Sequence, residues 1–358
     1  MSKKKILYLN LSTNEKDISL GFSNSWLSKF ADKFESVDLI SLNICSNNQT
    51  EFKNVNIFGI SEPEKLSRID KYLKLKNLVK DLTQKNDYSI CFSHMSPLLS
   101  IIANWYNKNK KTISILWYTH PMPKELIKKI VLYISLFFNN QIVTASESSF
   151  PYFSKKVNVI GHAIDYEAFL NKKTNISNNN FVILSRISKS KNLELSIDCF
   201  LKSKFNQDSI TVIGDAVTDA DMEYKAFLAE KYRTKNNVIF KGMIPHKELP
   251  DVLRSYSYHI NSTPPGFYDK SVLETLAAGI YNFYLNGDYD KHFDPKTLKY
   301  TKFSSKENSL TDLLNSVYEL NNNKILEIVS FAQYSVSKES VETISDRVLS
   351  TVENLPNL

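Results

Sequence analysis

The stretch GFYDKSVLETLAAG, residues 266–279, decides how this sequence is interpreted. Its polar first half, which ends at Ser271, leads into a short apolar segment of the kind that forms a helix. Gly279 follows it, and glycine is the residue type favoured just past a helix C-terminus. Upstream, residues 258–263 have the composition of a strand, which two prolines stop. A strand, a polar loop and a helix start are therefore expected in succession.

This arrangement predicts an anion-binding site. The first backbone N–H groups of a helix have no partner inside it and point outward, so they bind anions. Glu274 lies one turn further along, where its carboxylate can accept hydrogen bonds from hydroxyls of the molecule that carries the anion. A nucleotide sugar offers both a pyrophosphate and a ring of hydroxyls. The alternative, from this stretch alone, is an ordinary helix in which Glu274 is solvated at the surface.

The bulk composition is that of a globular protein with two domains. The 358 residues are 42% hydrophobic and 23% charged, and each half is long enough for a core of its own. Three scattered cysteines form no disulfide framework or metal-spaced pair, which favours a reducing cytoplasm. The opening MSKKKILYLNLS is too short and mixed for a signal peptide, and no apolar run reaches the ~18 residues of a membrane span.

The positive charge lies in the first half. Residues 1–169 hold 22 Lys and Arg against 15 Asp and Glu, a balance of +7, whereas the remainder holds 23 of each. An anionic partner of the first half is therefore expected. No nucleic-acid-binding motif is present, so an anionic membrane surface or a phosphorylated acceptor fits better. Residues 124–138, KELIKKIVLYISLFF, predict either a buried helix or a surface helix that enters lipid.

Strands and helices alternate along the first half, which predicts a parallel sheet covered by helices on both faces. A lone Gly21 after the first strand is weak evidence for phosphate contact, because no G-x-G-x-x-G pattern surrounds it. His94 and His120 follow the strands expected at residues 88–92 and 113–117. Ligands bind at such strand ends in open α/β sheets. The alternative for each histidine is a hydrogen bond within its own loop.

A second alternating series follows an Asn- and Lys-rich linker at residues 171–180. Arg186 and Lys191 lie five residues apart across the turn after its first strand, so both cations can converge on one pyrophosphate. Glycine-bearing turns end the next strands, at Gly214 and Gly242. The loop before Glu274 ends another.

These turns resemble, in order, those of the retaining glycosyltransferases of family 4, which have the GT-B fold. VIGHAIDYEAF (residues 159–169) is similar to the family's entry into its second domain, and LSRISKSKN (184–192) to its G-R-x4-K-G turn. VIGDA (212–216) and NVIFKGMIP (237–245) match the next two strand ends. SVLETLAAG (271–279) matches the E-A-M-A-C-G helix. The resemblance spans most of the chain and is densest from residue 157 to residue 279.

The resemblance implies roles for particular residues. Arg186 and Lys191 would hold the donor diphosphate, Glu274 would bind ribose hydroxyls, and His120 would face the transferred sugar across the cleft. The backbone around Met243, Ile244 and Pro245 would receive the base. The candidate catalytic residues are thus His120, Arg186, Lys191 and Glu274, and the candidate donor-binding residues are Gly21, Ser185, Gly214, Met243, Ile244, Pro245, Gly266, Asp269, Lys270 and Ser271.

The sequence departs from the family pattern at three positions. Ser185 and Asn192 replace the glycines of the G-R-x4-K-G turn. Gly266 stands where the family usually has a glutamate that contacts the donor sugar, eight residues before the position of Glu274. Some members instead have an Asp-Lys pair before the helix, as Asp269 and Lys270 form here. Because Gly266 has no side chain, either Asp269 or Lys270 reaches the sugar, or water fills the gap.

The resemblance implies an α/β protein of the GT-B class, in which two Rossmann-like doubly wound domains face each other across a cleft and helices end the chain. Residues 1–170 would bind the acceptor and residues 171–335 the nucleotide sugar. Residues 336–358 would form a C-terminal helix that returns to the first domain.

The implied activity is retaining transfer of a hexosyl group to a glycan, lipid or other acceptor, as in polysaccharide biosynthesis. No cofactor besides the donor is expected, and no metal, because no D-x-D carboxylate pair adjoins a strand end. The expected location is cytoplasmic, with association to an anionic membrane and no nucleic acid partner. Two alternatives remain, a non-catalytic sugar-nucleotide or glycan-binding module that lost its glutamate at Gly266, and a nucleotide-sugar 2-epimerase of the same fold.

Overall fold

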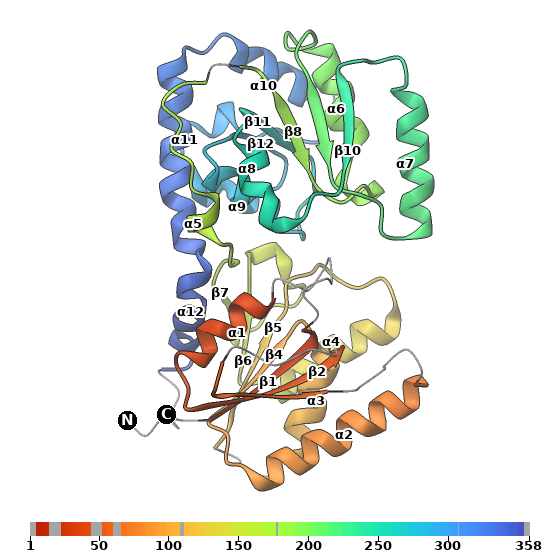
Figure 1. Ribbon diagram of the computed structural model, residues 1–358, viewed down its shortest axis with the longest axis vertical. Helices are drawn as coiled ribbons and strands as arrows, with labels where there is room; N and C mark the ends of the chain where they lie inside the picture. The colour runs from red at the N-terminus through yellow and green to blue at the C-terminus, as the bar shows by residue number, and fades with distance from the viewer. Residues whose placement is uncertain are drawn as a thin grey trace. The chain divides into compact units, whose positions relative to one another are not determined.

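The computed structural model describes residues 5–13, 23–43, 52–59, 66–107, 111–176, 178–306 and 308–353. The chain divides into two compact units (Figure 1). Unit 1 comprises Met1–Ala163 together with Val341–Leu358, and unit 2 comprises Ile164–Ser340. The chain therefore crosses between the units twice.

Unit 1 is a parallel sheet with helices on both faces. Within the described residues its strands lie in the order β3-β2-β1-β4-β5-β6-β7. Its elements, in chain order, are β1 (Lys5–Ser12), α1 (Ser23–Ala31), β2 (Ser36–Asn43), β3 (Val55–Gly59), α2 (Arg68–Lys85), β4 (Ile90–His94), α3 (Pro97–Tyr106), β5 (Ile113–Trp117), α4 (Leu126–Phe138), β6 (Gln141–Thr144), the 3-10 turn η2 (Glu147–Ser149), β7 (Val157–Val159), the 3-10 turn η8 (Val341–Thr343) and α12 (Ile344–Ser350).

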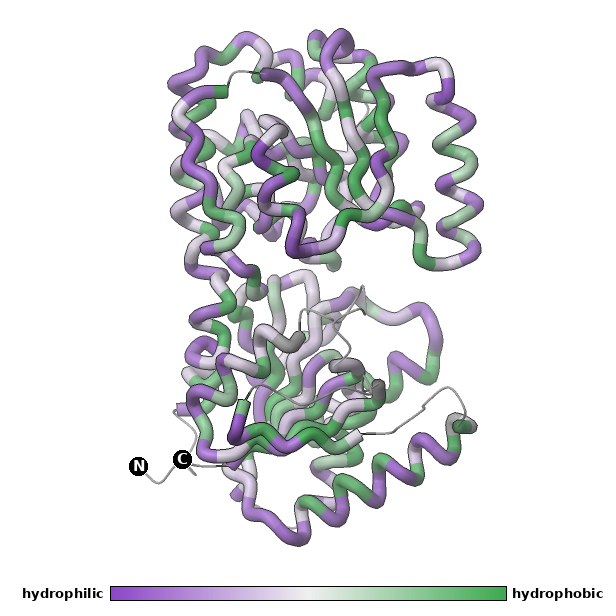
Figure 2. The backbone as a smooth tube through the Cα atoms, viewed as in Figure 1, coloured by the Kyte–Doolittle hydropathy of each residue, from purple (hydrophilic) through white to green (hydrophobic). Residues whose placement is uncertain are grey.

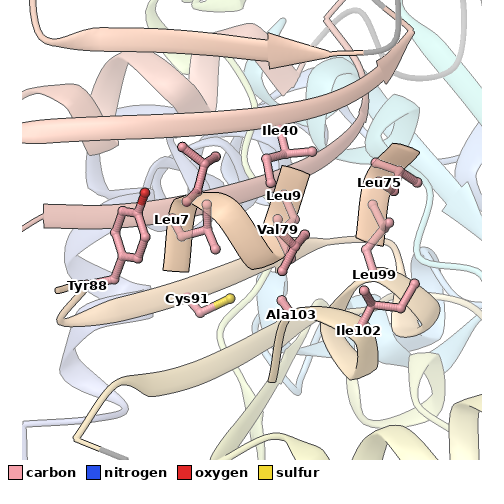
Figure 3. Close-up of a cluster of buried hydrophobic side chains, with 11 residues drawn as sticks. Leu7, Leu9, Ile40, Leu75, Val79, Tyr88, Cys91, Leu99, Ile102 and Ala103 are labelled. Atoms are coloured by element: carbon pink, nitrogen blue, oxygen red, sulfur yellow. The ribbon is translucent and has the colours of Figure 1, made fainter. Parts of the chain in front are cut away.

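The core of unit 1 follows from the alternation of side chains along its strands. Leu7 and Leu9 of β1 pack with residues of α2 and α3, among them Val79 and Ile102, as Figure 3 shows. Tyr8 faces the other way and packs its ring against Phe30 of α1. Both faces of the strand are buried, which is why β1 has a continuous apolar sequence instead of an alternating one.

The C-terminal segment belongs to unit 1. Helix α12 lies beside α1 (Figure 1). Lys29 and Lys33 of α1 form ion pairs with Glu342 and Asp346, both at 2.7 Å. These pairs are solvent-exposed and add little stability, so the buried side chains of Ile344 and Val348 hold the segment in place.

Unit 2 is a smaller sheet of the same kind, with strand order β10-β9-β8-β11-β12 among the described residues. Its elements are α5 (Tyr166–Phe169), β8 (Phe181–Leu184), η3 (Lys189–Lys191), α6 (Leu193–Lys202), β9 (Ile210–Ile213), α7 (Asp219–Lys231), β10 (Val238–Gly242), η4 (His246–Glu248), α8 (Leu249–Leu253), β11 (Tyr258–Asn261), α9 (Lys270–Ala277), β12 (Tyr281–Tyr284), η5 (Gly287–His292), η6 (Leu298–Tyr300), α10 (Ser309–Tyr318), α11 (Asn322–Val336) and η7 (Ser337–Glu339).

Most element boundaries agree with the sequence expectations, and the differences have local causes. Helix α7 begins at Asp219 because Thr218 and Asp221 form a reciprocal capping box. Helix α2 is capped by Ser67, which accepts a hydrogen bond from the Asp70 amide at 3.2 Å. Its alternating colours in Figure 2 are those of an amphipathic helix. No helix among the described residues has both the length and the apolar content of a membrane span.

Candidate functional site

The candidate site of unit 2 lies where the strand order reverses. From β8 the chain proceeds to β9 and β10 on one side, and it returns to β11 and β12 on the other. The β8–β11 register pairs Phe181 with Tyr258 and Val182 with His259 and goes no further, so the ends of these two strands are not paired with each other. In open α/β sheets this switch point, at the carboxyl ends of the strands, is the usual ligand site. The loops that leave β8 and β11 carry Lys191 and Asp269.

Lys191 and Asp269 form an ion pair across this switch point. The Lys191 ammonium lies 2.6 Å from Asp269 Oδ1, and the two side chains are 8% and 16% exposed. The same ammonium lies 5.3 Å from the centre of the Phe267 ring, within cation–π range. Nearby, Asn192 Nδ2 donates to the Ser262 carbonyl at 3.0 Å, which ties the loop after β8 to the end of β11. Lys191 is therefore fixed in position before any ligand arrives.

The Asp269 carboxylate is fully engaged by the protein. Its Oδ2 accepts hydrogen bonds from Thr263 Oγ1 at 2.6 Å and from Asn261 Nδ2 at 3.1 Å. Burial by itself would raise the pKa of Asp269. The charge of Lys191 and the three hydrogen bonds outweigh that effect and hold the pKa below its ordinary value. Asp269 therefore serves to hold Lys191.

Helix α9 begins directly after Asp269, and its N-terminus has no side-chain cap. The Asp269 carboxylate occupies the N-cap position but is turned to Lys191 instead of to the helix amides. Lys270 and Ser271, both partly buried, are the first helical residues. Burial lowers the pKa of the Lys270 ammonium to about 8, although the charge of Glu274 acts in the opposite direction. An uncapped helix N-terminus with two adjacent lysines is suited to a polyanion.

Glu274 is buried, with 5% of its surface exposed, so the alternative of a solvated surface residue is wrong. Its Oε1 is hydrogen-bonded to His246 Nε2 at 2.9 Å, and the His246 ring packs against Phe169 at 5.5 Å. Burial would raise the pKa of Glu274. The hydrogen bond and charge of His246, together with Lys270, lower it instead. Glu274 Oε2 makes no hydrogen bond to the described residues and stays open to a ligand hydroxyl.

The turns after β8, β9 and β10 are hydrogen-bonded to one another. The Ser185 amide donates to the Ile213 carbonyl at 3.1 Å, and the Gly214 amide to the Gly242 carbonyl at 2.9 Å. A Cβ added to Gly214 would lie 1.9 Å from the Ser185 carbonyl oxygen, and Gly214 has a φ of +137°. Glycine is therefore required there so that the turn can approach Ser185, a structural role.

The remaining predicted residues of unit 2 border the same sheet edge. Arg186 is exposed, and within the described residues its guanidinium has no acidic partner. Met243 is half exposed and Pro245 is exposed, in the loop that follows β10. Gly266 is buried and has a φ of +99°, which glycine tolerates. The structure thus brings the unit 2 candidates to one edge of one sheet, whereas Gly21 lies outside the described residues.

The two histidines of unit 1 differ. His94 ends β4, is fully buried and packs its ring against Trp26 at 5.1 Å, which favours a structural role. His120 follows β5, is exposed and lies edge-on to the Tyr118 ring at 6.0 Å. Met95, directly after β4, has a φ of +58°, a strained value for a side-chain-bearing residue. The carboxyl edge of this sheet therefore presents His120 to solvent.

A buried polar network supports the loop before α9, and no pattern in the sequence indicates it. The Tyr268 hydroxyl lies 2.7 Å from His292 Nε2 and donates to Glu339 Oε1 at 2.8 Å. Lys291 lies 2.7 Å from the same carboxylate oxygen. Burial would raise the pKa of Glu339, but His292 and Lys291 hold it far below its ordinary value. Glu339 is far from Tyr268 in sequence, so no local pattern predicts their contact.

His246 is hydrogen-bonded to Glu274 but is not among the site residues predicted from the sequence. It follows Pro245 directly, in the turn already matched to the resembled family, so its position was a usable indication. Asn261 and Thr263, which hold Asp269, likewise lie at the end of the expected strand. Their role depends on where the Asp269 side chain points, which spacing along the chain does not determine.

Comparison with known proteins shows the fold. No protein-family model and no curated protein sequence matches the chain. Among solved structures, HepE (Alr3699) of Anabaena in complex with UDP and glucose superposes with a TM-score of 0.74 at 15% identity, covering 98% of this chain and 100% of that one. A glycosyltransferase of Rickettsia africae has a TM-score of 0.72 at 12% identity, covering 99% and 100%. TarM has a TM-score of 0.70 at 12% identity, covering 98% and 99%. The chain therefore has the GT-B fold, which confirms the predicted fold class.

Proposed function

We propose that this protein is a glycosyltransferase that moves a sugar from a nucleoside-diphosphate sugar to a glycan, lipid or other acceptor. The observation that carries the proposal is the arrangement at the switch point of unit 2. There Lys191, held by Asp269, adjoins the uncapped N-terminus of α9, and the buried Glu274 lies one turn further along. The likeness in fold to HepE, whose structure contains UDP and glucose, supports the choice of donor.

Each group has a chemical task in this proposal. Lys191, Arg186 and the α9 amides receive the diphosphate, and they neutralise the charge that grows on it as the glycosidic bond breaks. Glu274 Oε2 accepts a ribose hydroxyl, while the loop of Met243 to Pro245 borders the base. Because cationic side chains and a helix terminus already supply the positive charge, the reaction needs no metal.

We further propose retention of configuration at the anomeric carbon and membership of family 4, on the motifs LSRISKSKN and SVLETLAAG. The acceptor attacks from the face that the diphosphate leaves, and a phosphate oxygen takes the acceptor proton. Lys270, one helical turn before Glu274, takes over recognition of the sugar where Gly266 offers no side chain. His120 of unit 1 serves the transferred sugar.

The proposal is tested with a panel of UDP-, GDP- and ADP-sugars. Turnover is followed by release of nucleoside diphosphate, and the anomeric configuration of the product by NMR. We expect Lys191→Ala and Arg186→Ala each to weaken donor use by about 10- to 150-fold, the loss of a charge-assisted hydrogen bond. Lys189→Ala is the matched control, because Lys189 is an exposed cation of the same turn.

The outcomes separate the alternatives. Nucleotide binding without turnover on any donor would identify a binding module, and conversion of the donor into its C2 epimer would identify an epimerase. An inverted product would contradict retention and leave the transfer reaction intact. Glu274→Gln should raise the donor KM, whereas equal kinetics in Glu274→Gln and wild type would refute the ribose assignment.

A further inference from the structure

Helix α4 of unit 1 exposes a continuous apolar stripe. Seven residues of α4 are exposed, and all of them except Lys128 are large and apolar. The exposed fraction is 71% for Leu126, 76% for Ile127 and 68% for Phe137. The other members of the stripe are Ile130, Tyr133 and Ile134. An exposed apolar patch of this extent on a single element marks an interaction surface.

The spacing of these residues places them all on one side of the helix, opposite the side that packs against unit 1. At 100° per residue the six side chains lie within one third of the helix circumference. The opposite side supplies the contacts with unit 1, since Leu132 and Ser135 are buried. A helix that is apolar on all sides is buried in a core or immersed in lipid. One side of α4 packs against the core of unit 1, whereas the opposite side is exposed. The prediction of a buried helix is therefore wrong for the exposed side.

The segment 151–156 extends the stripe. Its Tyr152 packs against Tyr133 of α4 with ring centres 5.5 Å apart, and the Tyr152 hydroxyl donates to the Lys129 carbonyl at 3.1 Å. Lys156 donates to the carbonyls of the last turn of α4, at Leu136 and Asn139, both at 2.8 Å. Phe153, the next residue after Tyr152, is fully exposed. An aromatic side chain is thus held in solvent beside the apolar stripe.

Positive charge accompanies this surface. Residues 124–138 and 151–156 together contain five lysines and one glutamate. Lys124, Lys128 and Lys155 are exposed. The glutamate, Glu125, is already paired with Lys128 at 2.9 Å. Any partner must therefore accept apolar side chains in the middle and offer negative charge at the edges.

We infer that the α4 stripe, Phe153 and the surrounding lysines form a docking surface for an anionic lipid membrane. A second copy of this chain fits less well, because it would bring two lysine-rich edges together. The 13 residues of α4 are too few to cross a bilayer, so the helix lies in the interfacial plane with its stripe among the acyl chains. Phe153, beside the stripe, then lies at headgroup depth, and the lysines meet lipid phosphates. The inference is independent of the proposed transfer reaction.

The test is flotation of the full chain with vesicles of phosphatidylcholine alone or with 30% phosphatidylglycerol, at low and high salt. Wild type should float with the anionic vesicles at low salt. Ile127→Gln/Ile130→Gln should reduce the affinity more than tenfold, since both side chains leave the acyl region. Lys124→Gln/Lys155→Gln should reduce it about 25-fold, because each lysine near an anionic leaflet contributes a factor of about five.

Two matched variants control for general effects. Phe227→Gln removes an exposed apolar side chain of α7, and Lys235→Gln removes an exposed cation of unit 2, and both should float like wild type. All replaced side chains are exposed, so the thermal midpoints should stay within a few degrees. Absence of flotation at low salt, or equal flotation of Ile127→Gln/Ile130→Gln and wild type, overturns the inference. So does a dimer that this double variant dissociates while vesicles bind neither protein.

Discussion

The pair formed by Lys191 and Asp269 allows stability and ligand binding to be separated. Both side chains are largely buried, and their charged atoms lie 2.6 Å apart. Removing one partner of a buried pair leaves the other charge uncompensated, which costs about 3–5 kcal/mol. Because Asp269 keeps 16% exposure, we expect about 3 kcal/mol for Lys191→Met and for Asp269→Asn. In a unit of this size that corresponds to a fall in Tm of about 6–12 °C.

The double variant tests whether the pair acts as a unit. Lys191→Met/Asp269→Asn removes both charges at once, so we expect its loss of stability to be at least 2 kcal/mol smaller than the sum of the single losses. The sign of the pH dependence follows from the lowered pKa of Asp269. A carboxyl whose pKa is lowered by folding stabilises the protein above its unfolded pKa of about 3.9, and the contribution is lost as the pH falls further. Asp269→Asn should lack this acid-dependent part.

Binding of nucleoside diphosphate should respond in a different way. Lys191→Met removes a cation from the phosphate site, and the affinity should fall by about 10- to 150-fold. Asp269→Asn removes a negative charge from the same site, so its affinity should equal or exceed that of wild type despite the lower Tm. Calorimetric titration of the variants with UDP, GDP and ADP, well below their Tm, measures this. A parallel loss of affinity in both single variants would refute the separate roles.

Three further predictions concern neighbouring positions. Gly214→Ala should lower the free energy of unfolding, measured by urea denaturation, by about 3 kcal/mol or more, because the added Cβ clashes with Ser185 and the backbone is strained. Gly242→Ala should lower it by only about 1–2 kcal/mol, because no atom lies within 4 Å of the added Cβ. Diphosphate affinity should fall as the pH rises through about 8, where Lys270 loses its proton, and titrations at pH 7 and 9 should show no such fall for Lys270→Met. Glu339→Gln should lose about 2–3 kcal/mol at pH 7, and the difference from wild type should shrink below pH 4 because the pKa of Glu339 is lowered by folding.

The fold was predictable because it depends on local patterns. Apolar runs such as residues 181–184, separated by helical segments, indicate a parallel sheet wherever the runs lie. The candidate cations were also predictable, because Lys191 is tied to a strand end by a short turn. What spacing did not reveal is which atoms meet. The ion pair of Asp269 with Lys191 joins two turns far apart in the sequence, and Glu339 reaches Tyr268 from a distant part of the chain.

For helix α4, the sequence could not predict which side of the helix faces solvent. The sequence KELIKKIVLYISLFF left a buried and a lipid-facing helix open, because a segment that is apolar all round has no polar face to mark its outer side. Only the packing of Leu132 and Ser135 against the rest of unit 1 identifies the inner side. The outer side is then defined by its exposed area.

The position of Asp269 explains how the proposed polyanion site remains stable without a ligand. Two lysines beside a helix N-terminus repel one another and the helix dipole, so a partly buried site of this kind needs a resident negative charge. Asp269 supplies it at the N-cap position, although its carboxylate bonds to Lys191, Thr263 and Asn261. In the proposed function, a diphosphate brings at least two negative charges against the one of Asp269, and it approaches a helix N-terminus that the Asp269 carboxylate does not cap. We therefore expect the donor to share Lys191 with Asp269 instead of displacing it, so that the site keeps its shape after the diphosphate leaves.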